Sequence, residues 1–209
     1  MTWLEILVEG AADVPVIKLV LTQRFGLVEN VHFRIHRHKG RGNLPADLLG
    51  QPDPKQQTLL HQLPAKLKGF SHLGDDACVV VLIDADRDPC RELLGQLKHM
   101  LARLPQRPPH TLFRLAIEET ESWFIADLKA VRAAYPKARL QKLGRIVADD
   151  VVGAWEELAA ALGRKASEVT GADKYAWAER IAPHMNLEEP HSPSLRKFIE
   201  GIDREVSRH

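Results

Sequence analysis

The stretch "VVVLIDADRDPC", residues 79–90, joins an unbroken apolar run to a cluster of aspartates. Five consecutive apolar residues indicate a strand that is buried on both faces, as in a parallel sheet covered by helices. Asp84 and Asp86 follow directly, and Asp88 comes two residues later. A purely structural strand end more often carries Gly, Asn or a single Asp, so this much negative charge needs another explanation.

Strand and helix patterns alternate on both sides of this stretch. Short apolar or alternating runs predict four strands, near residues 2–10, 30–40, 77–86 and 110–119. Segments of helical period follow these runs, the last of them over residues 120–135. This order predicts an α/β domain over residues 1–136, with a mostly parallel four-stranded sheet flanked by helices. Residues 137–209 show helical patterns only and are expected to form a helical extension packed on that domain.

The composition of the 209 residues is that of an ordinary globular protein, and it excludes several classes. A formal net charge of only +1 means that any contact with nucleic acid must come from a local basic patch. No apolar run approaches the roughly 18–20 residues that a membrane span needs. Acidic Glu5 and Glu9 stand where a signal peptide would be basic, and two cysteines make no disulfide framework. These features predict a cytoplasmic protein with no membrane partner.

Carboxylates follow three of the four predicted strands. In an open parallel sheet, ligands bind beyond the carboxyl ends of the strands, so these side chains are expected at one edge. Clustered carboxylates repel one another unless a cation lies among them, and their oxygens suit Mg²⁺ or Mn²⁺. Asp84 and Asp86 would project the same way from an extended segment. The candidate metal ligands are Glu9, Asp13, Asp84, Asp86, Glu118, Glu119 and Glu121. The alternative is that such acids cap helix N-termini.

A basic stretch, "HRHKGRGN" at residues 36–43, follows the second predicted strand. Its place beyond a strand end would bring it to phosphates beside the acidic cluster, where such contacts position a nucleic acid without reading its sequence. The candidate nucleic-acid contacts are His36, His38, Lys39 and Arg41. A solvated loop with ordinary charge is the alternative.

The combination of "LEILVEGAAD" (residues 4–13) and "VVVLIDADRD" (residues 79–88) resembles the Toprim domain. This topoisomerase–primase fold is shared with OLD-family nucleases and small-RNA maturases. Its signature is Glu-Gly after the first strand and Asp-x-Asp after the third, with a further acid one helical turn beyond the Glu in the nuclease branch. The positions that match are Glu9, Gly10, Asp13, Asp84 and Asp86.

A narrower resemblance covers nearly all of the chain. The stretches "IEETESWFIAD" and "GADKYAWAERIAPHM" are similar to a bacterial family of Toprim-like proteins of about this length. Its members are often linked to ATPase partners and to defence gene clusters. The wider Toprim resemblance covers about residues 1–130.

The resemblance implies a Mg²⁺- or Mn²⁺-dependent nuclease, or nuclease subunit, that cleaves phosphodiester bonds of DNA or RNA in antiviral defence. In that scheme Asp84 and Asp86 bind metal, Glu9 binds metal or acts as general acid or base, and Asp13 holds a second ion. Nuclease sites of this type supply a further acidic pair after the fourth strand, and which of the three glutamates in that region points into the site stays open. Lys174 would neutralise charge that develops on a phosphate, unless it is an ordinary exposed lysine.

A second interpretation comes from a different class. The same fold could serve as a non-catalytic partner or regulator of an ATPase, with a decayed site. The complete set of Glu9, Asp84 and Asp86 favours the enzyme, because a decayed site has no reason to keep three mutually repelling charges. For the enzyme, the sequence leaves open DNA or RNA as substrate, exonucleolytic or endonucleolytic cleavage, and one or two metals.

Overall fold

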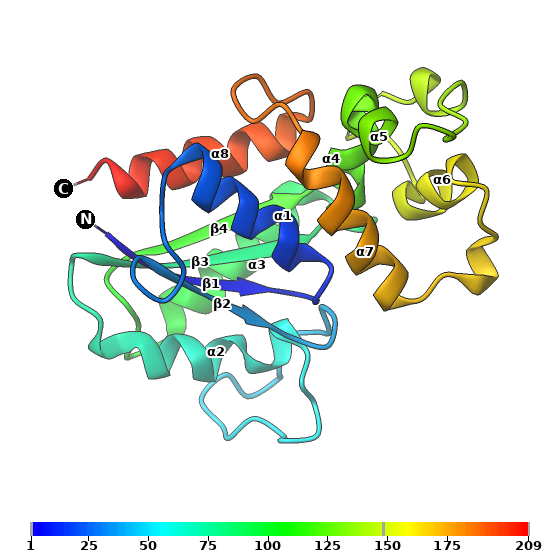
Figure 1. Ribbon diagram of the computed structural model, residues 1–209. Coiled ribbons are helices and arrows are strands. Elements are labelled where there is room, and N and C mark those ends of the chain that lie inside the picture. Colours follow the sequence, from blue (N-terminus) through cyan, green and yellow to red (C-terminus); the bar gives the residue numbers. More distant parts are fainter. Residues whose placement is uncertain (1, 148, 209) are drawn as a thin grey trace.

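The centre of the computed structural model, which describes residues 2–147 and 149–208, is a sheet of four strands (Figure 1). The strands are β1 (Trp3–Val8), β2 (Phe33–Arg37), β3 (Ala77–Asp84) and β4 (Thr111–Ala116). Their order is β2-β1-β3-β4, and every neighbouring pair is parallel. The predicted α/β class and four-stranded parallel sheet are therefore confirmed.

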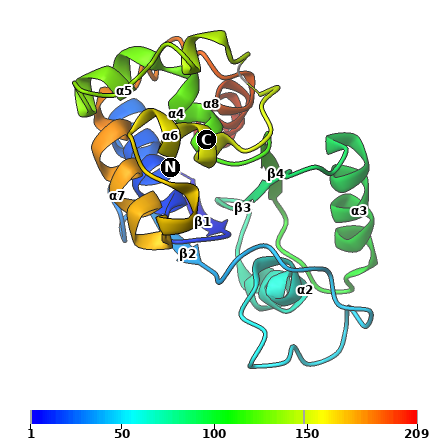
Figure 2. The same ribbon diagram turned by 90° about the vertical axis from the view of Figure 1, so that its right-hand side faces the viewer.

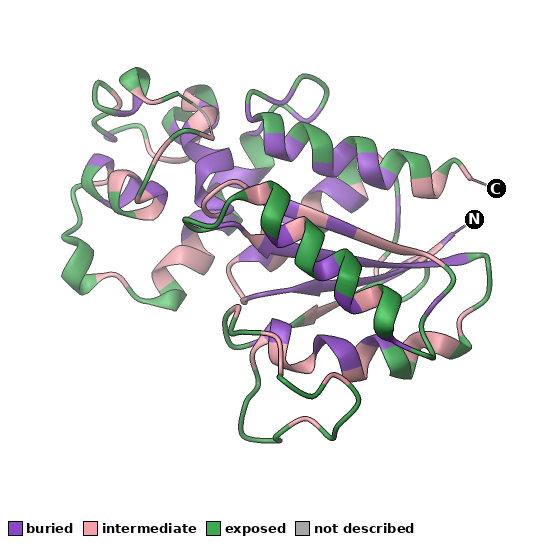
Figure 3. Cartoon of the chain, turned by 180° about the vertical axis from the view of Figure 1, so that it is seen from behind, coloured by how far each residue is buried: buried purple, intermediate pink, exposed green. Residues whose placement is uncertain are grey.

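Helices cover both faces of this sheet, as the apolar run of β3 predicts. Alternate residues of β3 belong to two different buried clusters, with Val80 in one and Val81 in the other. On one side lie α2 (Leu59–Gly69), which continues into a 3₁₀ turn at Phe70–His72, and α3 (Cys90–Arg103). On the other side lie α1 (Asp13–Leu19), with a π-helical turn at Val20–Arg24, and α8 (Pro193–Val206) (Figure 2). Buried residues make up most of β1 and β3 and lie on the inward faces of the helices (Figure 3).

The helices between β4 and α8 gather at the end of the sheet toward which the strands point (Figure 1). They are α4 (Glu121–Ala126), α5 (Leu128–Ala134), α6 (Ala154–Ala161) and α7 (Gly171–Ile181), with 3₁₀ turns at Leu143–Arg145, Ala166–Glu168 and Ala182–His184. Leu158 and Trp177 from this region share one buried cluster with Leu4 and Ile6 of β1. The helical extension is thus built onto the core of the sheet and covers its carboxyl edge.

The expectation of a single helix over residues 120–135 is wrong, because the helix is interrupted at Asp127, between α4 and α5. The Asp127 side chain accepts a hydrogen bond from Ala130 N–H (3.0 Å) and so caps α5. Its second oxygen accepts from Asn186 N–H (2.9 Å). One aspartate therefore starts a helix and holds a distant loop, a pairing that local periodicity does not reveal.

None of the described helices combines the length and the apolar character needed to cross a bilayer.

The shared core predicts that the sheet and the helical extension unfold together. Phe198 of α8 is fully buried, and its ring centroid lies 5.8 Å from that of Trp123 in α4. Phe198→Ala should cost about 3–5 kcal/mol of unfolding free energy, in one cooperative transition followed by circular dichroism and by tryptophan fluorescence in urea. The exposed Val152→Ala should change stability by less than about 0.5 kcal/mol. Two separate transitions, with only one shifted by Phe198→Ala, would contradict a shared core.

Candidate functional site

Three strand ends meet at the carboxyl edge of the sheet, and two hydrogen bonds tie them together. Glu9, directly after β1, accepts at Oε1 a hydrogen bond from the backbone N–H of Asp84 at the end of β3 (2.9 Å). Thr120, which precedes α4, donates its hydroxyl to Asp13 Oδ1 (2.9 Å). The parallel order of β1, β3 and β4 thus gathers acids that are far apart in the sequence, as the strand-end pattern predicted.

Asp84 lies at the centre of this acidic cluster. Burial and the negative charges of neighbouring carboxylates raise its pKa well above the usual 3.8; these neighbours are Asp13, Glu9, Glu121 and Glu119. Burial likewise raises the pKa of Glu9 to about 8, with Asp13 and Asp86 adding to the effect. Among the described residues, no Lys, Arg or His nitrogen lies within 4.0 Å of the carboxylates of Glu9, Asp13 or Asp84. The carboxylates at the centre of the cluster therefore have no cation of the described residues in contact with them, and they repel one another when they are ionised.

Asp13 is buried, and both of its carboxylate oxygens are engaged. Oδ2 accepts a hydrogen bond from Gly10 N–H (2.9 Å), and Oδ1 accepts from the Thr120 hydroxyl (2.9 Å). Asp13 is also the first residue of α1, where the helix dipole favours a negative charge. The structure thus places Asp13 in the cluster, where its two hydrogen bonds connect the turn after β1 to the turn before α4.

Glu119 and Glu121 are the two glutamates after β4 that turn toward the cluster. Lys174 of α7 lies between them, with its Nζ 3.4 Å from a Glu119 oxygen and 3.6 Å from a Glu121 oxygen. The same ammonium group lies 4.7 Å from the centre of the Trp155 ring, a cation–π contact. Burial raises the pKa of Glu119 to about 8, and Glu121 adds to it while Lys174 opposes it. Lys174 is half-buried and belongs to the site.

Glu118 has a different partner from its two neighbours. Its carboxylate accepts hydrogen bonds from the backbone N–H groups of Gly153 and Ala154 (2.7 Å to Ala154) at the start of α6. This is the helix-capping role that was the alternative explanation for the acids. Glu118 therefore fastens the helical extension to the end of β4.

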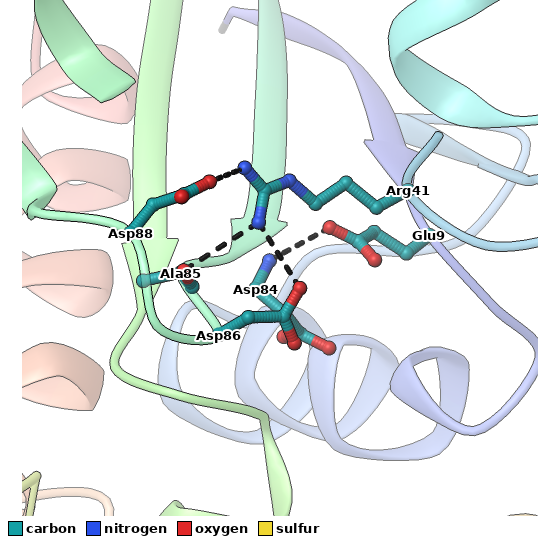
Figure 4. Close-up of polar contacts among 6 residues, drawn as sticks. All are labelled: Glu9, Arg41, Asp84, Ala85, Asp86 and Asp88. Carbon is teal, nitrogen blue, oxygen red and sulfur yellow. Dashed lines mark hydrogen bonds and ion pairs between the residues drawn. The ribbon is translucent and has the colours of Figure 1, made fainter. Parts of the chain in front are cut away.

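The expectation that Asp86 projects beside Asp84 from an extended segment is wrong. Strand β3 ends at Asp84, and Asp86 has a left-handed backbone (φ 46°). Arg41 Nη1 instead binds the Asp86 carboxylate at 3.0 Å, and Arg41 also contacts Asp88 (Figure 4). Asp86 N–H donates to the carbonyl of Glu118 (2.9 Å), which has a left-handed backbone as well (φ 60°). Such paired non-glycine outliers are typical of functional sites.

The four predicted nucleic-acid contacts split into different environments. His36 Nε2 lies 2.5 Å from Glu5 Oε2 on the neighbouring strand, and Arg41 is bound to the aspartates after β3. His38 is buried, with its Nδ1 2.7 Å from the carbonyl oxygen of Val8. Lys39 is exposed. Only Lys39 thus presents its side chain openly to solvent in the way that the loop pattern suggested.

Comparison with known proteins gives one match. A family model described as "Domain of unknown function (DUF4276)" matches residues 8–203, which include strands β2, β3 and β4, the acidic cluster and most of the helical extension. No curated protein and no solved structure matches the chain. Within the described residues, no group of three or more His, Cys, Asp or Glu side chains is placed so that it could hold a metal ion.

The raised pKa values predict how stability depends on pH in the absence of divalent ions. The carboxyls of Glu9 and Glu119 titrate near 4.5 when unfolded and near 8 when folded. The folded state therefore binds these protons more tightly, and the stability present below pH 4.5 is lost as pH rises toward about 8. The melting temperature in EDTA should fall over this interval, by about 2–4 °C for each kcal/mol lost.

Asp84→Asn should flatten this decline and raise the melting temperature near pH 8, because it removes the charge that the other carboxylates repel. Asp150→Asn, the same change at an exposed aspartate, is the matched control and should follow the wild-type curve. A wild-type melting temperature that stays level or rises across this interval would show that the cluster carries no net repulsion.

Proposed function

This chain belongs to the DUF4276 family, and we propose that it is a Mg²⁺- or Mn²⁺-dependent nuclease, or nuclease subunit, of the Toprim type. Its substrate would be the phosphodiester backbone of DNA or RNA. The match of Glu9-Gly10, Asp13 and Asp84 to the Toprim signature supports this assignment. A cytoplasmic location, a role in defence and an ATPase partner belong to the same proposal.

The observation that carries the proposal is that helix capping does not explain why some of these carboxylates are buried together. Asp13 and Glu121 stand in the first turns of α1 and α4, and Glu118 caps α6, so the helix dipole accounts for three of the acids. Glu9, Asp84 and Glu119 lie outside helices and come from three separate strand ends. Burying like charges together costs free energy unless protons or a cation join them.

The chemistry of these groups fits a hard divalent cation. Carboxylate oxygens are the ligands that Mg²⁺ and Mn²⁺ take, together with water and substrate phosphate, and Glu9 and Asp84 have no cation of the described residues in contact with them. Because no three of the described side chains are placed to hold an ion as they stand, Glu9, Asp84 and Glu119 would have to move together to hold one. Asp86 would join them on exchanging its contact with Arg41. Such an ion would supply charge for a phosphate oxygen and a more acidic bound water.

The remaining side chains have separate roles in this proposal. Without metal, burial raises the pKa of Glu9 to about 8, so a Glu9 that does not hold the ion suits a general acid or base as the alternative to its role as a ligand. Lys174, held by Trp155 and by two glutamates, would neutralise charge on a phosphate at the edge of the cluster. Asp13 and Thr120 keep the turns after β1 and β4 at a fixed separation.

Titration calorimetry with Mn²⁺ tests the metal site without requiring a substrate. Wild type should bind, and Glu9→Gln and Asp84→Asn should each weaken binding by at least about tenfold, since each removes a ligand. Glu118→Gln, the matched control, should lower stability because it weakens the cap of α6, but it should leave Mn²⁺ affinity unchanged. Saturating Mn²⁺ should also raise the melting temperature of wild type more than that of Asp84→Asn.

Absence of Mn²⁺ binding at millimolar concentration, or equal binding by Asp84→Asn, would contradict the metal site. The non-catalytic ATPase partner would then be the better interpretation. If Mn²⁺ binds, cleavage of labelled single- and double-stranded DNA and RNA should require it and should be lost in Asp84→Asn. Metal binding without any cleavage of these substrates would contradict the nuclease assignment and retain the metal site.

A further inference from the structure

A basic pocket of about 580 Å³ opens beside the acidic cluster, between the end of β2 and α2. Its wall includes Ala11, from the turn that follows Glu9 and Gly10. Backbone hydrogen bonds hold the frame, because Lys39 N–H donates to Gln57 O (2.8 Å) and Gly40 N–H donates to Glu9 O (2.9 Å). The residues that line the pocket are Ala11, Arg37, His38, Lys39, Pro54, Gln57, Gln62 and Lys66.

The charge of this pocket is opposite to that of the neighbouring cluster. Arg37, Lys39 and Lys66 line it, and no Asp or Glu of the described residues does so. Lys66 reaches it from α2 and is half-buried, and this burial lowers its pKa because an ammonium group loses hydration there. Three cations without a lining carboxylate favour an anion.

His38 is a second, independent observation that points to a ligand. This residue is only 9% exposed. Because Val8 O can only accept, Nδ1 must carry the hydrogen of the 2.7 Å contact, and Nε2 has no hydrogen-bond partner among the described residues. A buried ring nitrogen without a partner costs free energy. An anionic oxygen in the pocket would favour the protonated ring and would accept a hydrogen bond from its Nε2–H.

The position of the pocket relates it to the carboxylates. Ala11 lies two residues after Glu9, and Gly40, one residue after Lys39, donates its N–H to the Glu9 carbonyl. A chain molecule that carries regularly spaced negative groups would therefore meet both sites at once. Repulsion by Glu9 and Asp84 would keep those groups off the acidic cluster unless a cation is present, whereas the basic pocket needs none.

We propose that this pocket binds one backbone phosphate of a nucleic-acid strand. The neighbouring phosphodiester of the same strand would be the one cleaved at the carboxylate site. The proposal rests on the nuclease function and deepens it, since it assigns substrate binding to Arg37, His38, Lys39 and Lys66. We assign the pocket to the phosphate because its charged lining residues, Arg37, Lys39 and Lys66, are cations, and contacts of this kind position a strand without reading its bases. The strand is thus held without a sequence requirement.

Fluorescence anisotropy of a labelled single-stranded oligonucleotide of mixed sequence tests this pocket in EDTA, where neither metal binding nor cleavage enters. Arg37→Gln, Lys39→Gln and Lys66→Gln should each weaken binding by about fivefold or more. Each should also reduce the slope of log affinity against log salt by about 1. Lys68→Gln is the matched control, because this lysine lies on α2, is exposed and does not line the pocket. Arg37 and Lys39 are exposed, so their variants keep the test valid if Lys66→Gln fails to fold.

Inorganic phosphate separates a free anion site from a nucleic-acid site. Competition by phosphate at high concentration, with oligonucleotide binding sensitive to the three substitutions, supports the proposal. Phosphate binding without oligonucleotide binding overturns it in favour of a small-anion site. Oligonucleotide binding that is equal in wild type, the pocket variants and Lys68→Gln overturns it as well, as does no binding of either probe. These outcomes are independent of Mn²⁺, so failure of the metal site and failure of the pocket are told apart.

Discussion

Everything proposed for this chain depends on one constraint, the convergence of like charges at the carboxyl edge of a parallel sheet. Because β1, β3 and β4 run in the same direction, Glu9, Asp84 and the glutamates after β4 reach the same edge. Two hydrogen bonds, from Asp84 N–H to Glu9 and from Thr120 to Asp13, hold them there against their repulsion. A fold that keeps such charges buried accepts lower stability, which is the usual cost of a prepared binding site.

The helical extension completes this edge. Glu118 anchors α6 to the end of β4, and Lys174 enters from α7 to sit between Glu119 and Glu121. Arg41 holds the loop after β3 through Asp86 (Figure 4). The edge therefore combines a group of buried acids with two cations, Lys174 and Arg41, and a basic pocket opens next to it between the end of β2 and α2. This alternation of charge suits a substrate that is itself a line of phosphates.

The fold and the place of the site follow from local patterns, whereas the partners of individual side chains do not. The apolar run before Asp84 indicates a strand buried on both faces, and acids after three strands place a cluster at one edge. The pairing of Arg41 with Asp86 joins residues 45 apart, and no periodicity records it. In the sequence, Asp127 cannot be distinguished from other polar residues of a helix, and its hydrogen bond from Asn186 N–H is evident only in the structure. Lys66 reaches the pocket only because α2 packs beside β2.

The most direct test of the metal site is anomalous X-ray scattering from a crystal grown with Mn²⁺. We predict a manganese peak at the carboxyl edge of the sheet, coordinated by Asp84 and Glu9 with a third carboxylate from Glu119 or Asp86. Arg41 should then have released Asp86 in any structure where Asp86 is a ligand. A crystal saturated with Mn²⁺ that shows no peak at this edge, or a peak only elsewhere, would contradict a metal-dependent site.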